Sequence, residues 1–513
     1  MNIAQLLTAT LRQVDPQRVA LADPDGSRTF GDFTHRLAAL TTWLRSRGFG
    51  PGQRIGILSR NSIDYLEAWW SVIAIGATAV PLNFRLVAAE LRRIIAANPL
   101  SACFCSAELV GLLGEADDCL AEKPVIVWGG DVAGMPFEVR QIEDLVAQSR
   151  CELEVTAVAD EAPFSIIYTG GTSTGSPKGV IRTHGNATAH AFLAPGHNFS
   201  GRRRTVLCST PLFHAAGQIG LFNLLVGGAV VLSGRGFDTR QFLELVNRYQ
   251  VEAAFVVPTI VIELTQITGV AHVPSLRELR CGSAPLPLEV ARRLVAKFPG
   301  VWFGNGAGST EAGTYAVVGW EEMSAHPYGC VGRAPLGQEV RIFSEQGAEL
   351  APDGMGEIVI RGGQVSPGFW GQPERTTEVF REGWLKTGDL GWIDQEGLLY
   401  LVDRKDDLII SGGENVYARE IEEILYAVSG VAEAAVVAMG DPRWGEVPVA
   451  AVVAAPGASP LCDIESALEQ KLARYKHPRK IVLFEWLPKT AVGKIDKREL
   501  RARFRQITPE PAA

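Results

Sequence analysis

The residues best suited to chemistry lie in segment 169–179, which reads T-G-G-T-S-T-G-S-P-K-G. One interpretation is nucleophilic: residues 171–175 match the G-x-S-x-G elbow of serine hydrolases, with Ser173 as the attacking group. The other is electrostatic: the glycines let backbone N–H groups approach an anion, the hydroxyls add donors, and Lys178 adds a positive charge. The elements on either side of the segment distinguish the two interpretations.

The flanking elements favour binding of phosphate. A nucleophile elbow needs a strand, a sharp turn at the serine and then an immediate helix. The apolar segment 164–168 predicts the strand, but Pro177 and the β-branched segment 180–183 predict a second strand where the helix should begin. Two residues also separate Gly175 from the lysine, so the segment is not a Walker A loop. We therefore expect a phosphate-binding loop of a different kind, held between two strands.

The composition is that of an ordinary globular protein. The 513 residues are 47% hydrophobic and 21% charged, and the net charge of −8 argues against a nucleic-acid partner. The apolar segment 65–80 is interrupted by polar residues and is shorter than a membrane span, which predicts a buried helix. No basic and apolar leader is apparent at the N-terminus, and the eight cysteines are scattered. We expect reduced thiols, no membrane span and a cytoplasmic location.

Two sequence patterns divide the chain. In the first and longer part, strand-like segments such as 54–58 alternate with helical ones, which is typical of α/β architecture with largely parallel sheets. The last part reads as a compact α+β unit, and the five consecutive charged residues 403–407 separate the two. We expect a large N-terminal domain of parallel-rich α/β sheets, residues 1–403, and a small α+β C-terminal domain, residues 404–513.

The loop at 169–179 resembles the signature loop of the acyl-adenylate-forming superfamily, which contains acyl-CoA synthetases, nonribosomal-peptide adenylation domains and beetle luciferases. Further motifs of that superfamily follow in its usual order and cover nearly the whole chain. They are P-L-F-H at 211–214, G-S-A-P-L at 282–286, N-G-A-G-S-T-E at 305–311, G-W-L-K-T-G-D at 383–389, D-R-K-D at 403–406 with S-G-G-E-N at 411–415, and P-K-T-A-V-G-K at 488–494. The chain is most similar in these motifs to an acyl-CoA synthetase.

The resemblance implies an ATP-dependent acid–CoA ligase. A carboxylate attacks the α-phosphate of ATP to give acyl-AMP and pyrophosphate, and the thiol of coenzyme A then displaces AMP. ATP, Mg²⁺ and coenzyme A are the implied cofactors, and a small-molecule carboxylic acid is the implied substrate. Two alternatives stay open: a stand-alone adenylating enzyme that delivers the acyl group to a carrier protein or another acceptor, and a degenerate nucleotide-binding relative. The oligomeric state, with a homodimer as one option, is open as well.

The resemblance also implies roles for individual residues. Lys494 would place a positive charge between carboxylate and triphosphate, and His214 would orient the acyl group or gate the thiol path. Glu311, with Thr169, would hold Mg²⁺, and Thr310 would bind the α-phosphate. Together, the catalytic residues would be Lys494, His214, Glu311 and Thr310. The implied ATP- and AMP-binding residues are Thr169, Gly170, Gly171, Thr172, Ser173, Thr174, Lys178, Ser283, Ala284, Pro285, Asn305, Gly306, Thr310, Asp389, Arg404 and Lys494.

A mobile C-terminal domain is part of the same expectation. The small domain would rotate about Asp406 between the two half-reactions, as a hinge of a few residues allows. That rotation would carry Lys494 away and bring Gly412 and Gly413 towards the coenzyme A path, where glycine permits a close backbone approach.

The sequence departs from the superfamily pattern in three places. The phosphate loop has one residue too many, which leaves open which of Thr172, Ser173 and Thr174 faces the phosphates. Ala307 stands where an aromatic side chain, usually tyrosine, packs on the adenine, so stacking should be weaker unless another side chain replaces it. Ser309 replaces the common apolar residue before the threonine.

The expected acyl pocket is small and apolar. No basic residue within it would pair with a second carboxylate. This predicts a medium-chain, branched or aryl monocarboxylic acid as substrate. The residues expected to line the pocket are Ala215, Ala216, Gly217, Val256, Val257, Ala307 and Gly308.

Overall fold

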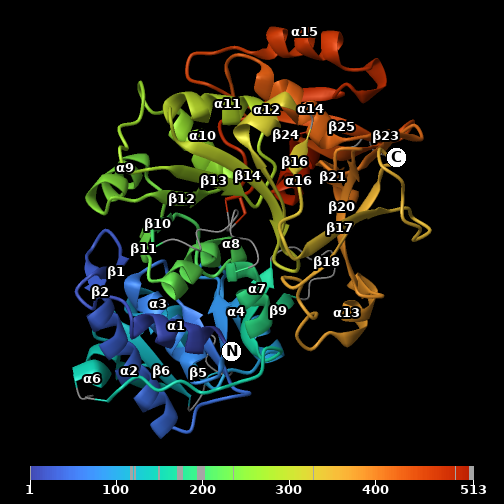
Figure 1. The fold of residues 1–513 in the computed structure, drawn as a ribbon. Coiled ribbons are helices and arrows are strands. Elements are labelled where there is room, and N and C mark those ends of the chain that lie inside the picture. Colours follow the sequence, from blue (N-terminus) through green and yellow to red (C-terminus); the bar gives the residue numbers. More distant parts are fainter. Residues whose placement is uncertain are drawn as a thin grey trace.

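The computed structural model describes residues 2–115, 120, 123–147, 151–169, 177–192, 203–234, 236–326, 329–490 and 493–507. These described residues form four sheets, with helices packed between and around them (Figure 1). Two of the sheets are parallel-rich and contain the strands up to Gly319, while the other two are mainly antiparallel. The expected α/β class, with a large N-terminal part and a small C-terminal part, is confirmed.

One parallel-rich sheet holds the ends of the predicted phosphate loop. Its strands run in the order β7-β6-β5-β3-β4-β8-β9, and only β8 and β9 pair in the antiparallel sense. Because a strand follows the loop, and not a helix, the nucleophile elbow is excluded. The bounds are β3 (Arg54–Leu58), β4 (Thr78–Leu82), β5 (Ala102–Ser106), β6 (Pro124–Trp128), β7 (Glu138–Gln141), β8 (Pro163–Thr169) and β9 (Lys178–Thr183).

The other parallel-rich sheet runs in the order β15-β14-β13-β12-β10-β11-β1-β2. Its inner strands are parallel, so their carboxyl ends lie at one edge, the place where open α/β sheets bind ligands. The bounds are β1 (Val19–Ala22), β2 (Ser27–Thr29), β10 (Thr205–Cys208), β11 (Ala229–Leu232), β12 (Ala253–Val256), β13 (Glu278–Gly282), β14 (Trp302–Ser309) and β15 (Gly313–Gly319).

The helix α3 (Ile63–Ala74) lies in the apolar core that the two sheets share. Its side chains from Tyr65 onward are buried on all faces, and Trp69 meets Trp70 and Phe164 edge to face. Apolar side chains lie on every face of this helix, with Glu67 buried among them, which agrees with the buried helix expected at 65–80, although that segment continues into strand β4. Among the described residues, no helix has the length and apolar composition needed to span a membrane.

The third sheet corrects the expectation of largely parallel sheets before residue 403. It runs β16-β21-β20-β18-β17, with β19 beside β20, and every pair is antiparallel. The connections from β19 to β20 and from β20 to β21 are only a few residues long, which antiparallel pairing permits and parallel pairing does not. The bounds are β16 (Cys330–Gly332), β17 (Gln338–Phe343), β18 (Gly356–Gly362), β19 (Phe380–Arg381), β20 (Trp384–Ile393) and β21 (Leu399–Arg404).

The C-terminal unit contains the fourth sheet, reached through the short helix η4 (Lys405–Asp407) after β21. The predicted amphipathic helix is α14 (Ala418–Ala427), whose Ile421 and Leu425 are buried in the core. The change of sheet falls between Arg404 and Ile409, and the domain boundary at 403/404 stays a prediction. The strand bounds are β22 (Ile409–Ser411), β23 (Glu414–Val416), β24 (Val431–Asp441), β25 (Gly445–Ala454) and β26 (Lys480–Leu483).

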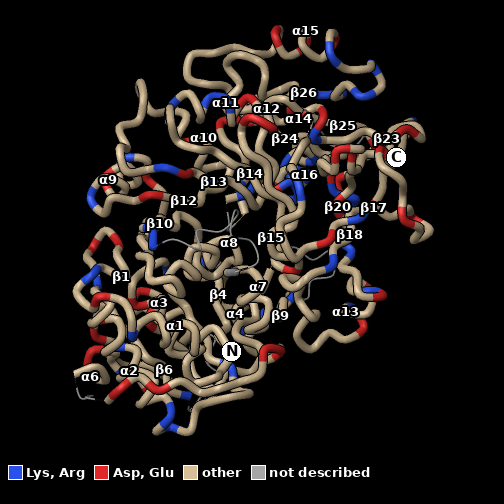
Figure 2. Tube along the Cα trace, in the orientation of Figure 1, with Lys and Arg blue, Asp and Glu red and all other residues tan. Residues whose placement is uncertain are grey.

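The remaining helices cover the sheets, and in Figure 1 α15 lies at the top of the C-terminal unit, far from the helices around the N-terminus. Basic and acidic residues are interspersed along the described trace (Figure 2). The helix bounds are α1 (Ile3–Leu11), α2 (Phe30–Ser46), α4 (Ala88–Ala97), α5 (Val110–Gly114), α6 (Ile142–Ala147), α7 (His184–Phe192), α8 (Ala215–Gln218), α9 (Thr239–Arg248), α10 (Pro258–Thr265), α11 (Leu288–Lys297), α12 (Trp320–Ala325), α13 (Pro373–Val379), α15 (Leu461–Lys471) and α16 (Lys497–Ile507).

Candidate active site

The carboxylate of Asp389 forms one wall of the candidate nucleotide site. Asp389 in β20 pairs with Arg404 in β21, and Arg404 Nε donates to Asp389 Oδ1 at 3.2 Å. The Tyr315 hydroxyl, from β15, donates to Asp389 Oδ2 at 2.8 Å. The side chain of Asp389 is 8% exposed, so both oxygens are held in place. A fixed carboxylate of this kind fits the two hydroxyls of a ribose.

A buried acceptor fits the base of the nucleotide. Asn305 in β14 is 4% exposed, and its Oδ1 has no hydrogen-bond partner among the described residues. Gly306 pairs with Gly282 at the end of β13, so segment 283–285 and Asn305 share one sheet edge. Ser283 has a φ of 75°, a left-handed conformation that costs free energy and is common at functional sites. Because a buried acceptor needs a donor, the amino group of adenine fits there, and the residues present therefore fit ATP.

Two strands hold the ends of the phosphate loop, while residues 170–176 lie outside the described part of the chain. Thr169 at the end of β8 pairs with Lys178, the first residue of β9. Burial and Arg375 lower the pKa of Lys178, and the carboxylate of Glu311 acts in the opposite direction. The Lys178 ammonium therefore lies within electrostatic reach of Glu311 and Arg375. The expected phosphate contacts of Gly170, Gly171, Thr172, Ser173 and Thr174 stay predictions.

Lys494 approaches the same group of side chains from the C-terminal unit. The Thr490 hydroxyl accepts a hydrogen bond from the Lys494 backbone N–H at 3.2 Å. Burial and Arg404 lower the pKa of Lys494 to about 8. Asp389 and Glu311 act in the opposite direction, so the structure brings these four charged side chains into one electrostatic cluster.

His214 precedes the short helix α8 and also faces Lys494. Its Nδ1 accepts from the Ala216 N–H at 3.4 Å, which assigns the ring hydrogen to Nε2 in the neutral form. Burial and Lys494 lower the pKa of His214 to about 4, so the ring is neutral at pH 7. Position 217 requires glycine, because a Cβ there would lie 2.1 Å from the Pro211 carbonyl oxygen. His214 thus offers the cleft a hydrogen-bond donor.

Thr310 and Glu311 follow β14 and are held through their backbone. Arg182 Nη1 in β9 donates to the Thr310 carbonyl at 2.8 Å, and the Ser366 N–H donates to the Glu311 carbonyl at 2.7 Å. Within the described ranges, no partner forms an ion pair with the Glu311 carboxylate. Mg²⁺ is usually held by one or two protein carboxylates plus substrate phosphates, so Glu311 and Thr169 fit this ion.

The residues expected to serve coenzyme A lie on the exposed surface of the C-terminal unit. Gly412 and Gly413 join β22 to β23 with φ of 62° and 89°, the two positive values that a type I′ hairpin requires. The Trp444 ring lies against this turn, where a Cβ on Gly412 would meet it at 2.6 Å. The guanidinium groups of Arg443 and Arg479 lie 4.9 and 5.6 Å from the centre of the Trp444 ring.

The C-terminal unit contacts the N-terminal part through α14 and α11. The Leu288 N–H donates to Glu423 Oε2 at 3.2 Å, and Arg293 Nη2 donates to the Tyr426 carbonyl at 2.9 Å. The C-terminal unit makes these two hydrogen bonds in the same orientation that places Lys494 near Asp389 and Glu311. Asp406, the expected hinge, lies in η4 and influences Lys178 electrostatically, but its role as a hinge stays a prediction.

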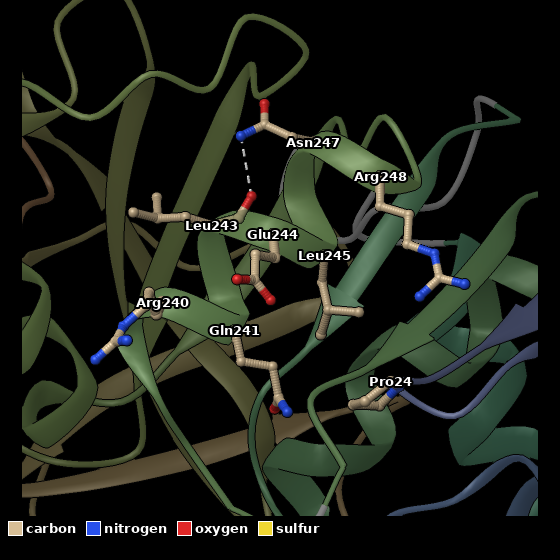
Figure 3. Close-up of a pocket in the computed structure, with 8 residues that line it drawn as sticks. All are labelled: Pro24, Arg240, Gln241, Leu243, Glu244, Leu245, Asn247 and Arg248. Atoms are coloured by element: carbon tan, nitrogen blue, oxygen red, sulfur yellow. Dashed lines mark hydrogen bonds between the residues drawn. The ribbon is translucent and has the colours of Figure 1, made fainter.

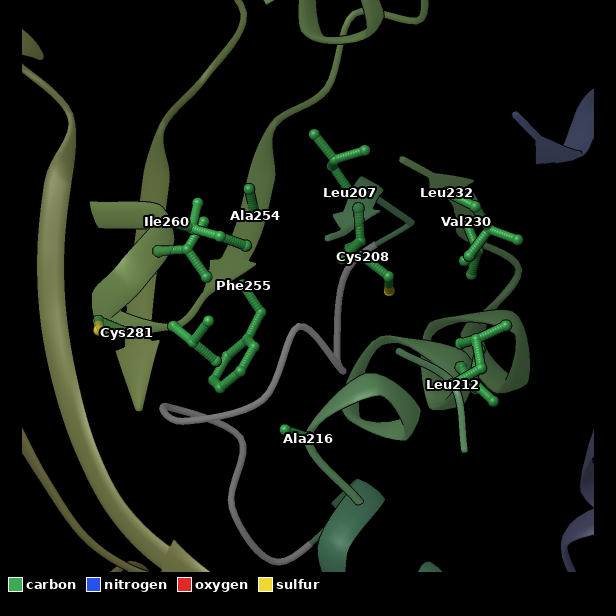
Figure 4. Close-up of a cluster of buried hydrophobic side chains, with 14 of the residues drawn as sticks. Leu207, Cys208, Leu212, Ala216, Val230, Leu232, Ala254, Phe255, Ile260 and Cys281 are labelled. Atoms are coloured by element: carbon green, nitrogen blue, oxygen red, sulfur yellow. The ribbon is translucent and has the colours of Figure 1, made fainter. Parts of the chain in front are cut away.

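The expected acyl pocket lies beside the core shown in Figure 4, which contains side chains from β10, β11, β12 and α8. Val256, Val257 and Ala216 are 0%, 7% and 8% exposed. Ala307 is 9% exposed and packs in the apolar cluster that also contains Tyr315. Residues 193–202, which follow α7, are outside the described ranges, so the outline of the pocket stays a prediction.

A separate hollow of about 610 Å³ runs along α9 (Figure 3). None of the residues expected at the active site lines it. The lining residues are Pro24, Arg240, Gln241, Leu243, Glu244, Leu245, Asn247 and Arg248.

Comparison with known proteins identifies the family. Residues 9–370 match the model of the AMP-binding enzymes, and residues 420–494 match the model of the C-terminal domain of the same enzymes. The chain belongs to the AMP-binding enzyme family. The resemblance to the acyl-adenylate-forming superfamily is thereby confirmed.

Other AMP-binding enzymes are similar over almost the full chain. A feruloyl-CoA synthase of Amycolatopsis sp is 35% identical over 506 residues, which cover 96% of this chain and 97% of that protein. A 2-succinylbenzoate–CoA ligase of Geobacillus kaustophilus is 32% identical and covers 95% of each chain. Among solved structures, the amide bond synthetase McbA from Marinactinospora thermotolerans has a TM-score of 0.87 at 26% identity, covering 98% of this chain and 100% of that one.

The structure brings together five of the residues expected from the AMP-binding motifs: Lys494, Glu311, Asp389, Arg404 and His214 form one charged and polar group. Their individual roles stay predictions. Sequence reasoning missed four side chains. These are Tyr315 and the cluster of Trp444, Arg443 and Arg479. The only available signals were a tyrosine shortly after the T-E motif and an R-W pair in a turn.

Proposed function

We propose that this chain is an ATP-dependent acid–CoA ligase that forms an acyl-adenylate from an aromatic or other apolar monocarboxylic acid. The observation that supports it most is the convergence of Lys494, His214, Glu311 and Asp389 into one electrostatic group. Those side chains come from two different parts of the chain, and their charges match the reaction. Membership of the AMP-binding enzyme family agrees with this proposal.

In the first half-reaction, an oxygen of the substrate carboxylate forms a bond to the α-phosphorus, and the bond from that phosphorus to the pyrophosphate oxygen breaks. Two anions must meet for this to happen. The Lys494 ammonium would offset their repulsion, in a cleft where partial burial strengthens the attraction. Asp389 would hold the ribose, and Lys178 would lie with the departing phosphates. Glu311 and Thr169 would hold Mg²⁺, which neutralises phosphate charge.

His214 would act as a hydrogen-bond donor in this proposal. Its Nδ1 is engaged by the Ala216 N–H, and the low pKa of the ring keeps it uncharged at neutral pH. The Nε2–H can therefore bind a carboxylate or carbonyl oxygen of the substrate. No general base is needed for the second half-reaction, because a thiol with an ordinary pKa near 8.5 ionises readily.

The Trp444 cluster supports coenzyme A as the acceptor. Coenzyme A combines a flat adenine with several phosphates. Its recognition needs an aromatic face and cations, which Trp444, Arg443 and Arg479 provide beside Gly412.

A second group of cations lies near Phe213, the residue that precedes His214. The guanidinium groups of Arg60 and Arg85 lie 5.0 and 5.6 Å from the Phe84 ring, which packs edge to face on Phe213. These cations would attract phosphates on the way to the cleft.

An aromatic acid is the favoured substrate class. The described pocket residues are small and apolar, and none of them is a cation that would pair with a second carboxylate. Relatives named for feruloyl-CoA and indoleacetate–CoA formation act on aromatic monocarboxylic acids. Medium-chain and branched monocarboxylic acids are the other substrate classes to be tested.

A panel assay tests the proposal. Pyrophosphate release would be measured with aromatic, medium-chain and branched acids, with and without coenzyme A, alongside formation of the thioester. We expect acid-dependent release, thioester formation with coenzyme A, and loss of release in Lys494→Ala. Release without any thioester would contradict coenzyme A as acceptor, and absence of release for every acid would indicate a nucleotide-binding relative.

Two tryptophan variants test the acceptor site. Trp444→Ala should raise KM for coenzyme A about ten-fold or more, the effect expected for one stacked base, and should leave acid-dependent pyrophosphate release unchanged. Trp486→Ala is the matched control, because Trp486 is an exposed ring of the same unit that also has an arginine, Arg503, over its face at 4.1 Å. Equal effects of the two variants would contradict the assignment.

Similarity to an amide bond synthetase motivates a second candidate, in which an amine takes the acyl group. The same assay distinguishes it. Supplying primary amines in place of coenzyme A would then give an amide as the main product, with Trp444→Ala having no effect.

A further inference from the structure

We propose that Tyr315 is a positioning residue for the nucleotide, which holds the Asp389 carboxylate so that each of its oxygens can accept one ribose hydroxyl. The inference rests on the proposed function for the identity of the ligand. It concerns a side chain outside the motifs on which that function depends.

A β-bulge brings Tyr315 to the carboxylate. Ala307 of β14 pairs with Ala316 of β15, but the next residue of β14, Gly308, pairs with Thr314. Tyr315 is therefore the extra residue of β15, and bulges of this kind redirect a side chain. The redirected side chain crosses from the parallel-rich sheet to Asp389 in the antiparallel sheet, where the hydroxyl donates at 2.8 Å.

The count of lone pairs supports the assignment. A carboxylate has about four acceptor sites, two on each oxygen. Tyr315 occupies one site on Oδ2, and Arg404 occupies one on Oδ1. One site on each oxygen is left, which matches the 2′- and 3′-hydroxyls of a ribose. Without Tyr315, Oδ2 would have two open sites and the carboxylate could turn.

Tyr315 is the more constant of the two donors. Its side chain is fully enclosed, with 1% of the residue exposed, whereas the side chain of Arg404 is 63% exposed. Arg404 also lies two residues before the expected hinge at Asp406, so a rotation of the C-terminal unit can disturb it. The Tyr315 contact depends only on the two sheets of the N-terminal part, so it would persist through both half-reactions.

The contact also compensates for the missing aromatic ring at Ala307. Tyr315 packs in the same apolar cluster as Ala307, but its ring is buried and offers no open face to adenine. Recognition of the nucleotide would thus depend more on the ribose and less on stacking. Loss of the Tyr315 hydroxyl should therefore weaken the binding of the ribose hydroxyls.

Binding and kinetics of Tyr315→Phe test the inference. We expect Kd and KM for ATP to rise about ten-fold, as for the loss of one hydrogen bond to a charged group, with kcat changed less than about two-fold because binding is weakened equally in the ground and transition states. In the unchanged protein, 2′-deoxy-ATP and 3′-deoxy-ATP should bind more weakly than ATP. In Tyr315→Phe, this discrimination should shrink by several-fold. Tyr315→Met gives a second measurement if the Phe variant unfolds.

The matched control is Tyr400→Phe, which removes a hydroxyl that donates to Asp394 Oδ2 at 3.1 Å in the same antiparallel sheet. It should leave ATP binding unchanged. Unchanged ATP affinity in Tyr315→Phe would overturn the inference. So would an equal loss for ATP and both deoxy analogues together with a lowered melting temperature, since that result indicates a merely structural role. Because calorimetric ATP binding needs no turnover, failure of the proposed reaction would be seen separately as absence of pyrophosphate release.

Discussion

The charge on Lys494 should make the first half-reaction sensitive to alkaline pH. Burial and Arg404 lower the pKa of this ammonium from its ordinary value of 10.5 to about 8. Only the protonated side chain can offset the repulsion between the carboxylate and the triphosphate. As pH rises through 8, the charge is lost and kcat/KM for ATP in acyl-adenylate formation should fall.

The magnitude follows from the same value. With a pKa of about 8, about half of the free enzyme carries the charge at pH 8 and about a tenth at pH 9, so kcat/KM should fall about ten-fold per pH unit above that point. Bound triphosphate adds negative charge and stabilises the ammonium. The alkaline fall of kcat should therefore lie at higher pH than that of kcat/KM, which reports the free enzyme. His214, with a pKa of about 4, adds no change between pH 6 and 8.

The assay is acid-dependent pyrophosphate release without coenzyme A, followed from pH 6 to 10. Lys494→Arg is the control, because a guanidinium stays charged throughout this range and should remove the alkaline fall even if the rate is lower. Thioester formation from isolated acyl-adenylate should instead rise with pH, as the thiol ionises. A constant kcat/KM up to pH 9.5, or the same alkaline fall in Lys494→Arg, would refute the reasoning.

Three further predictions concern other parts of the structure. Arg293→Ala removes a hydrogen bond between α11 and α14, and it should slow pyrophosphate release more than thioester formation from isolated acyl-adenylate. Arg292→Ala, a variant of the exposed neighbouring residue, should change neither rate. Equal slowing of both steps by Arg293→Ala would contradict this prediction. Ala307→Tyr should lower KM for ATP about three- to ten-fold if the new ring stacks on adenine, and a raised KM would show that the space is already filled. Arg36→Met leaves the buried carboxylate of Glu67 without its closest cation, at 2.6 Å, and should destabilise the fold by about 3–5 kcal/mol in denaturant unfolding; a loss below 1 kcal/mol would contradict the importance of the pair.

The fold could be predicted as far as local patterns determine it. Apolar segments such as 54–58 and 164–168 were strands, and α14 had the expected apolar face. The antiparallel sheet between residues 330 and 404 was not foreseen. Strand direction is set by the connections and by long-range pairing, which the periodicity of a single strand does not contain.

The site could be predicted where it depends on motifs, and not where it depends on three-dimensional proximity. Lys494 and Asp389 stand in recognisable segments, and the structure brings them together. Tyr315 lies 74 residues from Asp389, to which its hydroxyl donates, and Trp444 is also separated in sequence from Gly412 and Arg479. A bulge and a left-handed glycine turn bring these rings into place, and neither feature has a period that sequence reasoning could detect.

Lys494 also links the chemistry to the expected rotation of the C-terminal unit. The pKa of about 8, against 10.5 in water, means that holding the charged side chain in the cleft costs about 3 kcal/mol before any substrate binds. The triphosphate and the carboxylate offset this cost, so the closed orientation is favoured when both are bound. Departure of pyrophosphate removes most of that negative charge and restores the cost. The described hydrogen bonds between α11 and α14, one at Glu423 and one at Arg293, are among the contacts that this penalty would oppose. The same buried charge that assists adenylate formation would therefore favour opening once that step is complete.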